Sequence, residues 1–261
     1  MYQAEEYRRA ESVEEAAALL RDDGKSAVIA GGMWLRMGSG VYSRLIDLSR
    51  LGLDRITETE SAVELGAMTT LRQLETSELL RRCFGPVFSE CTAPIVGVQF
   101  RNSATVGGSV CGKYAFSDVI PVLLSLDAEA VTSAGTYPLE QYLEENHGRE
   151  LLIFLRVGKD GRRSAYRTQR NSATDFGNLD LCVARLSGGE WRVSVGARPG
   201  RAVRCREAEA ALAAGDRRAA AEAVAALSYG DTFRASGDYR RALSGVLLRR
   251  ACAAIEEEEK V

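Results

Sequence analysis

Histidine is almost absent from this chain of 261 residues, because His147 is the only one. A single histidine excludes any site that needs two imidazoles, and it leaves little basis for Ser–His–Asp or Cys–His catalysis. The stretch around it, residues 144–149, is polar, so we expect His147 to be a solvated loop residue. We predict no catalytic side chain, and expect any chemistry to come from a bound cofactor.

Cysteine spacings typical of metal sites are also missing. None of the six cysteines stands at the C-x-x-C spacing that lets one turn present two thiolates to a metal ion. We therefore predict no metal site or iron–sulfur cluster held by this chain, and expect its cysteines to be small core residues. They are Cys83, Cys91, Cys111, Cys182, Cys205 and Cys252.

An excess of one charge and a long apolar run are absent as well. Lys and Arg total 34 against 36 Asp and Glu, a net charge of −2 that gives no general attraction for nucleic acid or anionic membranes. No apolar run approaches the ~20 residues of a membrane span, and residues 1–10 lack the apolar core of a signal peptide. These absences predict a cytoplasmic protein with no nucleic-acid partner and no membrane span.

Glycine, in contrast, is concentrated in two stretches. Arg101–Asp118 reads R-N-S-A-T-V-G-G-S-V-C-G-K-Y-A-F-S-D, and Gly31-Gly32-Met33-Trp34-Leu35 follows an apolar segment. Dense glycines indicate a backbone that bends sharply or lies close to another group, and Ser117 or Asp118 is suited to cap a helix. A strand, a glycine turn and a short helix form an arrangement that presents backbone N–H groups to phosphate.

The remaining pattern predicts an α+β protein in two parts. The turn-rich, polar residues 158–163 indicate a boundary, with one domain at 1–158 and a C-terminal domain at 159–261. Capping sequences at Ser12 and Thr70 predict helix starts. Strands are expected at 6–9, 27–30, 45–48, 56–58, 62–66, 128–132 and 150–157, then at 164–168, 179–186 and 191–197, followed by two or three helices over 205–227 and a last helix over 239–256.

Two common nucleotide motifs fit the glycines poorly. Gly107 to Lys113 matches G-x-x-x-x-G-K of a P-loop, but Tyr114 stands where Ser or Thr would hold magnesium, and a polar segment precedes Gly107. A Rossmann site is set aside because no G-x-G-x-x-G follows a predicted strand. The P-loop is kept as the last of three alternatives.

The glycine stretches together resemble a known family. Ala30-Gly31-Gly32, Arg101-Asn102-x-Ala104-Thr105-Val106-Gly107-Gly108 and Ser117-Asp118 are similar to motifs of the FAD-binding (medium) subunit of molybdenum hydroxylases, the xanthine dehydrogenase family. The likeness covers nearly the whole chain, since Tyr166-Arg167, Arg170, Asp175-Phe176 and Ser236-x-x-Tyr239-Arg240-Arg241 also match. It implies a two-part FAD-binding domain of the vanillyl-alcohol-oxidase (PCMH) type, with a smaller C-terminal α+β domain of three strands and helices.

The resemblance also implies an FAD site. The two glycine turns would wrap the pyrophosphate through backbone N–H groups, which balance its charge without a basic patch. Asp118 would accept a hydrogen bond from a ribose or ribityl hydroxyl. The implied cofactor-binding residues are Ala30, Gly31, Gly32, Met33, Trp34, Leu35, Thr105, Gly107, Gly108, Ser109 and Asp118.

The implied function is electron transfer within a purine- or heterocycle-oxidising complex. Electrons would leave a molybdopterin-binding large subunit, cross a small [2Fe–2S] subunit, reach FAD on this chain and pass to NAD⁺ or another acceptor. The C-terminal domain would help to cover the isoalloxazine. The substrate cannot be read from this chain, because in the family it binds to another subunit.

The chain departs from the family at several positions. Met33 replaces a small polar residue, and residues 109–116 lack both asparagines and the proline of G-G-N-x-x-N-A-S-P-x-S-D. Tyr114 and Phe116 are bulkier than their family counterparts, whereas Lys113 could add a charge near phosphate. These departures keep a second alternative open, a degenerate scaffold of the same complex that has lost FAD.

Overall fold

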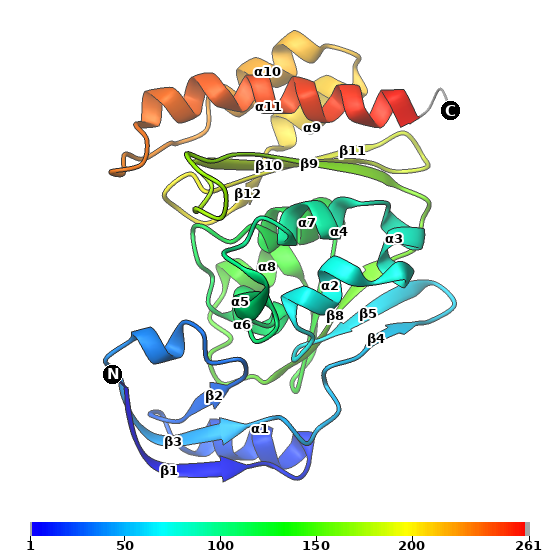
Figure 1. The fold of residues 1–261 in the computed structure, drawn as a ribbon. Coiled ribbons are helices and arrows are strands. Elements are labelled where there is room, and N and C mark those ends of the chain that lie inside the picture. The colour runs from blue at the N-terminus through cyan, green and yellow to red at the C-terminus, as the bar shows by residue number, and fades with distance from the viewer. Residues whose placement is uncertain (1, 259–261) are drawn as a thin grey trace.

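The computed structural model describes residues 2–258 and contains three sheets, each with its own helices (Figure 1). The first two sheets lie in the N-terminal part, and the third lies beneath the C-terminal helices. The mixed α+β composition agrees with the fold class predicted from the sequence. Within residues 2–258, no helix combines the length and the apolar character needed to cross a membrane.

The first unit is a parallel three-stranded sheet with a single covering helix. Its strand order is β1 (Gln3–Arg9), β3 (Val41–Asp47) and β2 (Ala27–Ile29). Helix α1 (Val13–Asp22) begins at Ser12, whose Oγ accepts a hydrogen bond from Glu15 N at 3.0 Å, as the capping sequence predicts. Ala16, Leu20 and Ile46 form a small core between helix and sheet.

The second unit is an antiparallel five-stranded sheet that carries most of the short helices. The strand order is β4 (Ile56–Glu58), β5 (Ala62–Gly66), β8 (Leu152–Gly158), β6 (Glu129–Thr132) and β7 (Thr136–Pro138). The helices are α2 (Leu71–Thr76), α3 (Glu78–Phe84), α4 (Val87–Thr92), α5 (Val98–Arg101), α6 (Val106–Cys111), α7 (Val119–Ser125) and α8 (Leu139–Glu144). Every residue of α7 is buried, so this helix forms the centre of the largest core.

The third unit confirms the three predicted C-terminal strands and adds a fourth. Strands β9 (Arg163–Gln169), β10 (Leu179–Arg185) and β11 (Trp191–Gly196) are joined by β12 (Val203–Arg204), which is too short to give a sequence pattern. Helices α9 (Arg206–Ala213), α10 (Arg217–Ala225) and α11 (Gly237–Glu258) cover one face of this sheet. Helix α7 packs on β10 and β11, and Tyr166 and Cys182 of the sheet join the core of the second unit.

A buried arginine explains the family-like ending of the chain. Arg240 is only 2% exposed, and its guanidinium donates to the carbonyl oxygens of Asn178 (2.7 Å), Gly230 (2.7 Å) and Ala235 (2.6 Å) and to Thr232 Oγ1 (2.8 Å). The five N–H donors of one arginine can satisfy several backbone acceptors at once. Arg240 therefore fixes the loop 230–236 on the third sheet, which is a structural role.

Candidate functional site

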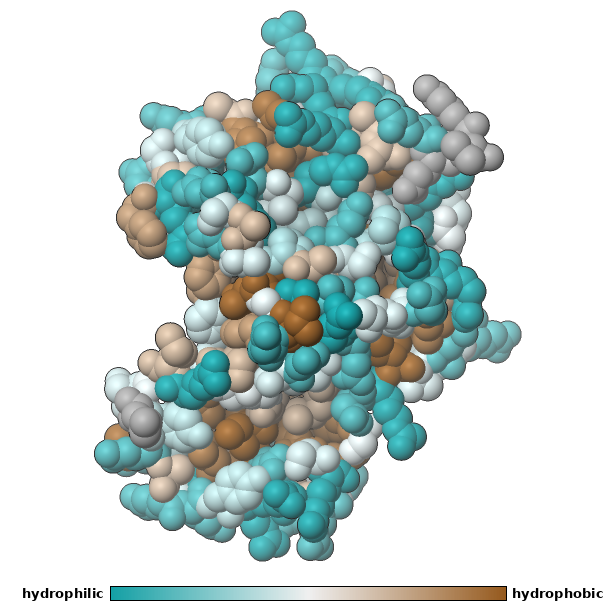
Figure 2. Space-filling model, in the orientation of Figure 1, coloured by the Kyte–Doolittle hydropathy of each residue, from teal (hydrophilic) through white to brown (hydrophobic). Residues whose placement is uncertain are grey.

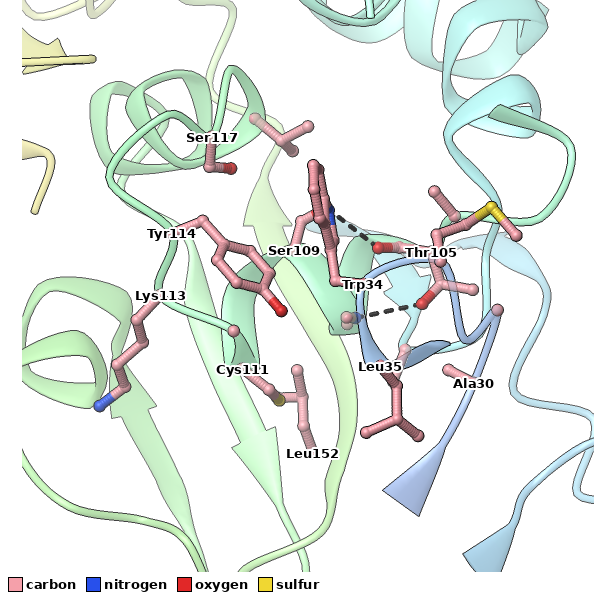
Figure 3. A pocket seen from close by; sticks show the side chains of 18 of the residues that line it. Ala30, Trp34, Leu35, Thr105, Ser109, Cys111, Lys113, Tyr114, Ser117 and Leu152 are labelled. Carbon is pink, nitrogen blue, oxygen red and sulfur yellow. Dashed lines mark hydrogen bonds between the residues drawn. The ribbon is translucent and has the colours of Figure 1, made fainter. Parts of the chain in front are cut away.

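The two glycine turns predicted from the sequence lie in direct contact. A Cβ atom added to Gly31 would stand 1.7 Å from the carbonyl oxygen of Ser103, so only glycine allows this approach. A Cβ atom on Gly107 would likewise stand 2.5 Å from the carbonyl oxygen of Ala67. Figure 3 shows Ala30, Trp34 and Leu35 of the first turn beside Thr105 and Ser109 of the second.

The first turn presents a row of unpaired backbone donors. Within the part of the chain that the structure describes, the N–H groups of residues 31–35 donate to no protein acceptor. Gly32 has φ = 65°, a left-handed conformation that glycine adopts without strain. The 3₁₀ helix η1 (Leu35–Met37) follows directly. Successive N–H groups in such a turn form a concavity that suits an anion.

The second turn differs, because its N–H groups have protein acceptors. Val106 N donates to Thr69 O at 2.9 Å, Gly107 N to Ala67 O at 2.9 Å, and Gly108 N to Thr105 Oγ1 at 3.1 Å. Ser109 is similar, since its N donates to Thr105 O at 3.0 Å and its Oγ to the same oxygen at 3.1 Å. The expectation that both turns offer free amides is thus met by the first turn alone.

The P-loop alternative is wrong. Its glycine segment should be a loop that precedes a helix and directs a lysine to phosphate, whereas here residues 106–111 are helix α6 itself. Lys113 Nζ donates instead to the carbonyl oxygens of Tyr142 (3.1 Å) and Glu145 (2.6 Å). Figure 3 shows Lys113 pointing away from Thr105 and Trp34, so its ammonium does not face the glycine turns.

A cavity of about 620 Å³ lies between the turns, within the range of roughly 300–1,000 Å³ typical of small-molecule sites. Ala30, both glycine pairs, Thr105 and Ser109 belong to its lining. So do Asp118, Arg170 and Phe176, from the segments before α7 and between β9 and β10, and Leu20, Ser26 and His147, from α1, the turn before β2 and the loop after α8. Apolar residues are visible at the waist of the molecule in Figure 2, between its upper and lower parts.

An aromatic cluster lines the cavity near Asp118. Trp34 contacts four rings, with centroid distances of 5.1 Å to Phe116, 5.5 Å to Tyr114 and 5.9 Å to both Phe100 and Phe176. Phe116 and Phe176 lie 4.6 Å apart. The bulky residues that depart from the family pattern therefore pack on one another and join three separate segments of the chain, and their sequence positions gave no sign of this contact.

Asp118 lies in a buried charged network. Its Oδ1 accepts a hydrogen bond from Tyr166 OH at 2.6 Å and another from Arg170. Burial, together with the nearby Asp180 carboxylate, raises the pKa of Asp118 to about 8, although Arg170 opposes this shift. Asp118 does not cap α7 through its side chain; Ser117 Oγ accepts from Ile120 N at 3.4 Å instead.

His147 is not the solvated residue expected from its polar neighbours. Its side chain is 6% exposed, and its ring stacks on Tyr142 at a centroid distance of 4.8 Å and contacts Tyr137 at 4.4 Å. Nδ1 lies 3.0 Å from Glu150 Oε1. The polar stretch follows α8 and folds back over the second sheet, so His147 lines the cavity.

The surroundings of Met33 and of two cysteines differ from what the sequence indicated. Met33, which offers no hydroxyl, packs its side chain against the largest hydrophobic core. Cys111 is exposed and lines the cavity, and Cys83 is half-buried, whereas the other four cysteines are buried as expected. Within residues 2–258, no group of three or more His, Cys, Asp or Glu is arranged to hold a metal ion.

The residues present fit a dinucleotide with a diphosphate at its centre. The free amides of residues 31–35 suit the diphosphate, and the cavity that they line also takes in residues from all three units of the fold. Three residues of the lining, Ser26, His147 and Arg170, each carry a side-chain atom without a hydrogen-bond partner, namely Ser26 Oγ, His147 Nε2 and Arg170 Nε. These atoms expose almost no surface, so the amides of residues 31–35 and not these side chains carry the fit to a ligand.

Comparison with known proteins identifies the family. Residues 2–157 match the model of the FAD binding domain in molybdopterin dehydrogenase. The 6-hydroxypseudooxynicotine dehydrogenase complex subunit alpha of Paenarthrobacter nicotinovorans is 30% identical over 95% of this chain and 93% of its own length. The carbon monoxide dehydrogenase medium chain of Hydrogenophaga pseudoflava is 27% identical over 94% of this chain and 95% of its own length.

Solved structures agree with this assignment. A structure of carbon monoxide dehydrogenase from Hydrogenophaga pseudoflava matches with a TM-score of 0.87 and 27% identity, covering 97% of each chain. The predicted two-part FAD-binding fold with its smaller C-terminal domain is thereby confirmed. The chain belongs to the family of FAD-binding medium subunits of molybdenum hydroxylases, and its cofactor is FAD.

Proposed function

We propose that this chain is the electron-transfer subunit of a complex with a molybdopterin-binding large subunit and a small [2Fe–2S] subunit. It takes electrons from the iron–sulfur clusters and passes them to NAD⁺ or another acceptor. The row of free amides at residues 31–35, open to the cavity, is the observation that carries the proposal. Relatives named as a medium chain or as a subunit of a dehydrogenase complex support it.

The pyrophosphate of FAD lies between the two turns in this proposal. Residues 30–35 hold it through N–H groups, and Thr105, Gly107, Gly108 and Ser109 shape the opposite wall. The isoalloxazine lies toward Asp118, Phe116 and Phe176, where an aromatic wall suits a flat conjugated ring. Bound FAD supplies the ability to accept electrons and to release them as hydride.

In this proposal the side chains around the isoalloxazine ring bind the cofactor and shield it from water, and none of them takes part in the reaction. The Asp118 network holds one carboxyl group against the Tyr166 hydroxyl and the Arg170 guanidinium, and a ribityl or ribose hydroxyl extends it. The aromatic cluster excludes water from the ring. In the proposed division into 1–158 and 159–261, Arg170 and Phe176 are contributed by the C-terminal domain, which therefore helps to cover the isoalloxazine.

The complex is proposed to oxidise a purine or another nitrogen heterocycle, as a xanthine dehydrogenase does. Two relatives are named a nicotine 6-hydroxylase medium subunit and a xanthine dehydrogenase FAD-binding subunit, with 28% and 30% identity over 94% and 49% of this chain. The cavity of this chain belongs to FAD, so substrate choice rests with the large subunit. Oxidation assays of the complex with heterocycles and with carbon monoxide test this part.

The first experiment is reconstitution of the purified chain with FAD. We expect a yellow protein with one FAD per chain, whose visible absorbance bleaches when NADH is added, because electron transfer between flavin and nicotinamide is reversible. Protein that stays colourless after incubation with excess FAD contradicts the proposal and favours the scaffold alternative. If dithionite reduces the bound FAD but NADH does not, the flavin passes its electrons to an acceptor other than NAD⁺.

A further inference from the structure

The third sheet turns one face toward the helices of the second unit, and two of its polar side chains lie on that face. Side chains alternate along a strand, and Tyr166 of β9 and Cys182 of β10 join the core of the second unit. Thr168 and Asp180 share this face, because each lies two positions from one of those residues. They are also register partners, and Thr168 Oγ1 donates to Asp180 Oδ1 at 2.5 Å.

Asp180 is completely buried, and only one of its oxygens has a hydrogen-bond partner. Its exposed fraction is 0%, and Oδ2 has no partner among the described residues. Gly177 lies directly over the other oxygen, since a Cβ atom on Gly177 would stand 2.2 Å from Asp180 Oδ1. An ionised carboxylate in such a place would lose its hydration without replacement, and this cost favours the neutral acid.

Asp118 brings a second carboxyl group to the same place. It precedes α7, which packs on β10 and β11, and it is 4% exposed. Its Oδ1 atom accepts hydrogen bonds from Tyr166 and Arg170, which lie two positions before and after Thr168. Asp118 is therefore held over the part of the sheet where Asp180 is buried. Unlike Asp180, it also lines the cavity.

One guanidinium cannot neutralise both carboxylates. Arg170 donates to Asp118, and its Nε atom has no partner among the described residues. Burial, together with the Asp180 carboxylate, raises the pKa of Asp118 to about 8, and burial also raises the pKa of Asp180. Two like charges in one buried site disfavour each other, and such a pair releases its protons in two separate steps.

The other ionisable groups that face the pair supply no further free positive charge. Arg167 of β9 faces Glu90 of α4, with Nη1 3.5 Å from Oε2. Burial raises the pKa of the remaining groups, so that they stay neutral at physiological pH; these are Cys91 of α4, Tyr166 of β9 and Cys182 of β10. The charge of the cluster therefore depends on the two carboxyl groups.

We propose that Asp118 and Asp180 share one proton at neutral pH, and that its loss at alkaline pH weakens the binding of FAD. This inference rests on the proposed position of the cofactor. With the proton present, the two carboxyl groups and Arg170 carry no net charge. After its loss two carboxylates repel each other, one at the start of α7 and one on the third sheet. This repulsion separates the two units at the cavity wall, where Arg170 and Phe176 meet Asp118.

The test compares wild type with Asp180→Asn across pH. Asparagine keeps the shape of the side chain and an acceptor for Thr168 but carries no charge, and Asp180 is not part of the cavity lining. Asp238→Asn, whose side chain is 92% exposed, is the matched control. Urea unfolding of the purified chain without cofactor measures stability, and flavin fluorescence measures the dissociation constant of FAD.

Stability should depend on pH more steeply in wild type than in Asp180→Asn. An unfolded aspartate releases its proton at about pH 3.9, whereas the folded pair keeps one up to about pH 8. The folded state binds more protons between these values, so stability falls as pH rises. Between about pH 5.5 and 7.5 the unfolding equilibrium constant of wild type should rise about a hundredfold relative to that of Asp180→Asn, and Asp238→Asn should follow wild type.

FAD affinity should change at higher pH. In this proposal FAD binds the protonated pair, so its dissociation constant rises by the inverse of the protonated fraction. For wild type we expect the constant to be about tenfold larger at about pH 9 than at about pH 7. For Asp180→Asn it should change less than about twofold and should lie within about twofold of the wild-type value at neutral pH.

The outcomes separate this inference from the proposed function. Parallel stability profiles in wild type and Asp180→Asn overturn the inference, because the pair then holds no shared proton. A wild-type FAD affinity that is the same at neutral and alkaline pH also overturns it, and this measurement needs no variant to fold. A wild-type chain that binds no FAD at any pH contradicts the proposed function itself, while the unfolding measurements still decide whether the proton is shared.

Discussion

The two glycine turns look alike in sequence and differ in what they offer. In the turn at residues 31–35 the amides donate to no protein acceptor, while in the turn at 105–109 they donate to Ala67, Thr69 and Thr105. Both turns need glycine because backbone atoms approach too closely for a Cβ. Gly31 lies against Ser103 and Gly107 against Ala67, so the same glycine pattern accompanies an open turn and a closed one.

The difference assigns separate tasks to the two turns. The first is open toward the cavity and suits an anion, whereas the second is closed by its own hydrogen bonds and sets the position of α6 against β5. Substitutions in the first turn should therefore affect cofactor binding more than stability. Substitutions in the second turn should do the reverse.

The largest effect is expected for Gly107→Ala. Its Cβ would stand 2.5 Å from Ala67 O, and such overpacking against backbone costs about 3 kcal/mol of unfolding free energy. Urea unfolding measures the loss. Gly158→Ala, where the added Cβ meets nothing within 4 Å, is the control and should stay within about 0.5 kcal/mol of wild type. A Gly107→Ala variant as stable as wild type would contradict the packing role that we assign to the second turn.

A smaller loss of stability but a larger loss of FAD is expected for Gly32→Ala. The left-handed φ of 65° costs an alanine about 1–2 kcal/mol, and relief of that strain rotates the amides away from the anion position. We expect FAD affinity to fall at least about tenfold, which corresponds to 1.4 kcal/mol. Fluorescence titration measures affinity and urea unfolding measures stability. Unchanged FAD affinity would mean that the first turn does not bind the pyrophosphate.

The smallest effect is expected for Thr105→Ala, which removes the hydroxyl that caps α6. Loss of an N-cap costs about 1 kcal/mol, and Ser77→Ala, which uncaps α3 away from the cavity, should cost a similar amount. FAD affinity should stay within about twofold, because the Thr105 hydroxyl bonds to the protein's own backbone at Gly108 and not to the cofactor. A much greater loss of FAD affinity in Thr105→Ala than in Ser77→Ala would show that the second turn also contacts the cofactor.

The sequence predicted what local patterns encode. Helix starts at Ser12 and Thr70, the antiparallel pair of β4 and β5 and the three main C-terminal strands follow from capping residues and alternation over a few positions. Both glycine turns were found for the same reason. Strand β12 was missed because two residues carry no periodicity.

The contacts that complete the cavity could not be predicted, since they join segments far apart in the chain. Ser26 is an ordinary serine in sequence, and His147 sits among polar residues, yet the fold buries both against one cavity. Lys113 has a sequence neighbourhood that suggests phosphate, but its ammonium reaches the end of α8. Side-chain direction after a turn depends on tertiary packing, which local sequence does not specify.

The proposed anion site at residues 31–35 consists of backbone amides. Within residues 2–258, Lys113 is the only lysine that lines the cavity, and its ammonium is bonded to the carbonyl oxygens of Tyr142 and Glu145, while Arg170 is already paired with Asp118. Salt screens interactions between exposed charges far more than it screens short hydrogen bonds from a fixed backbone. If the first turn binds the diphosphate as proposed, we expect FAD affinity in this chain of net charge −2 to depend on the shape of the turn and to change little with ionic strength.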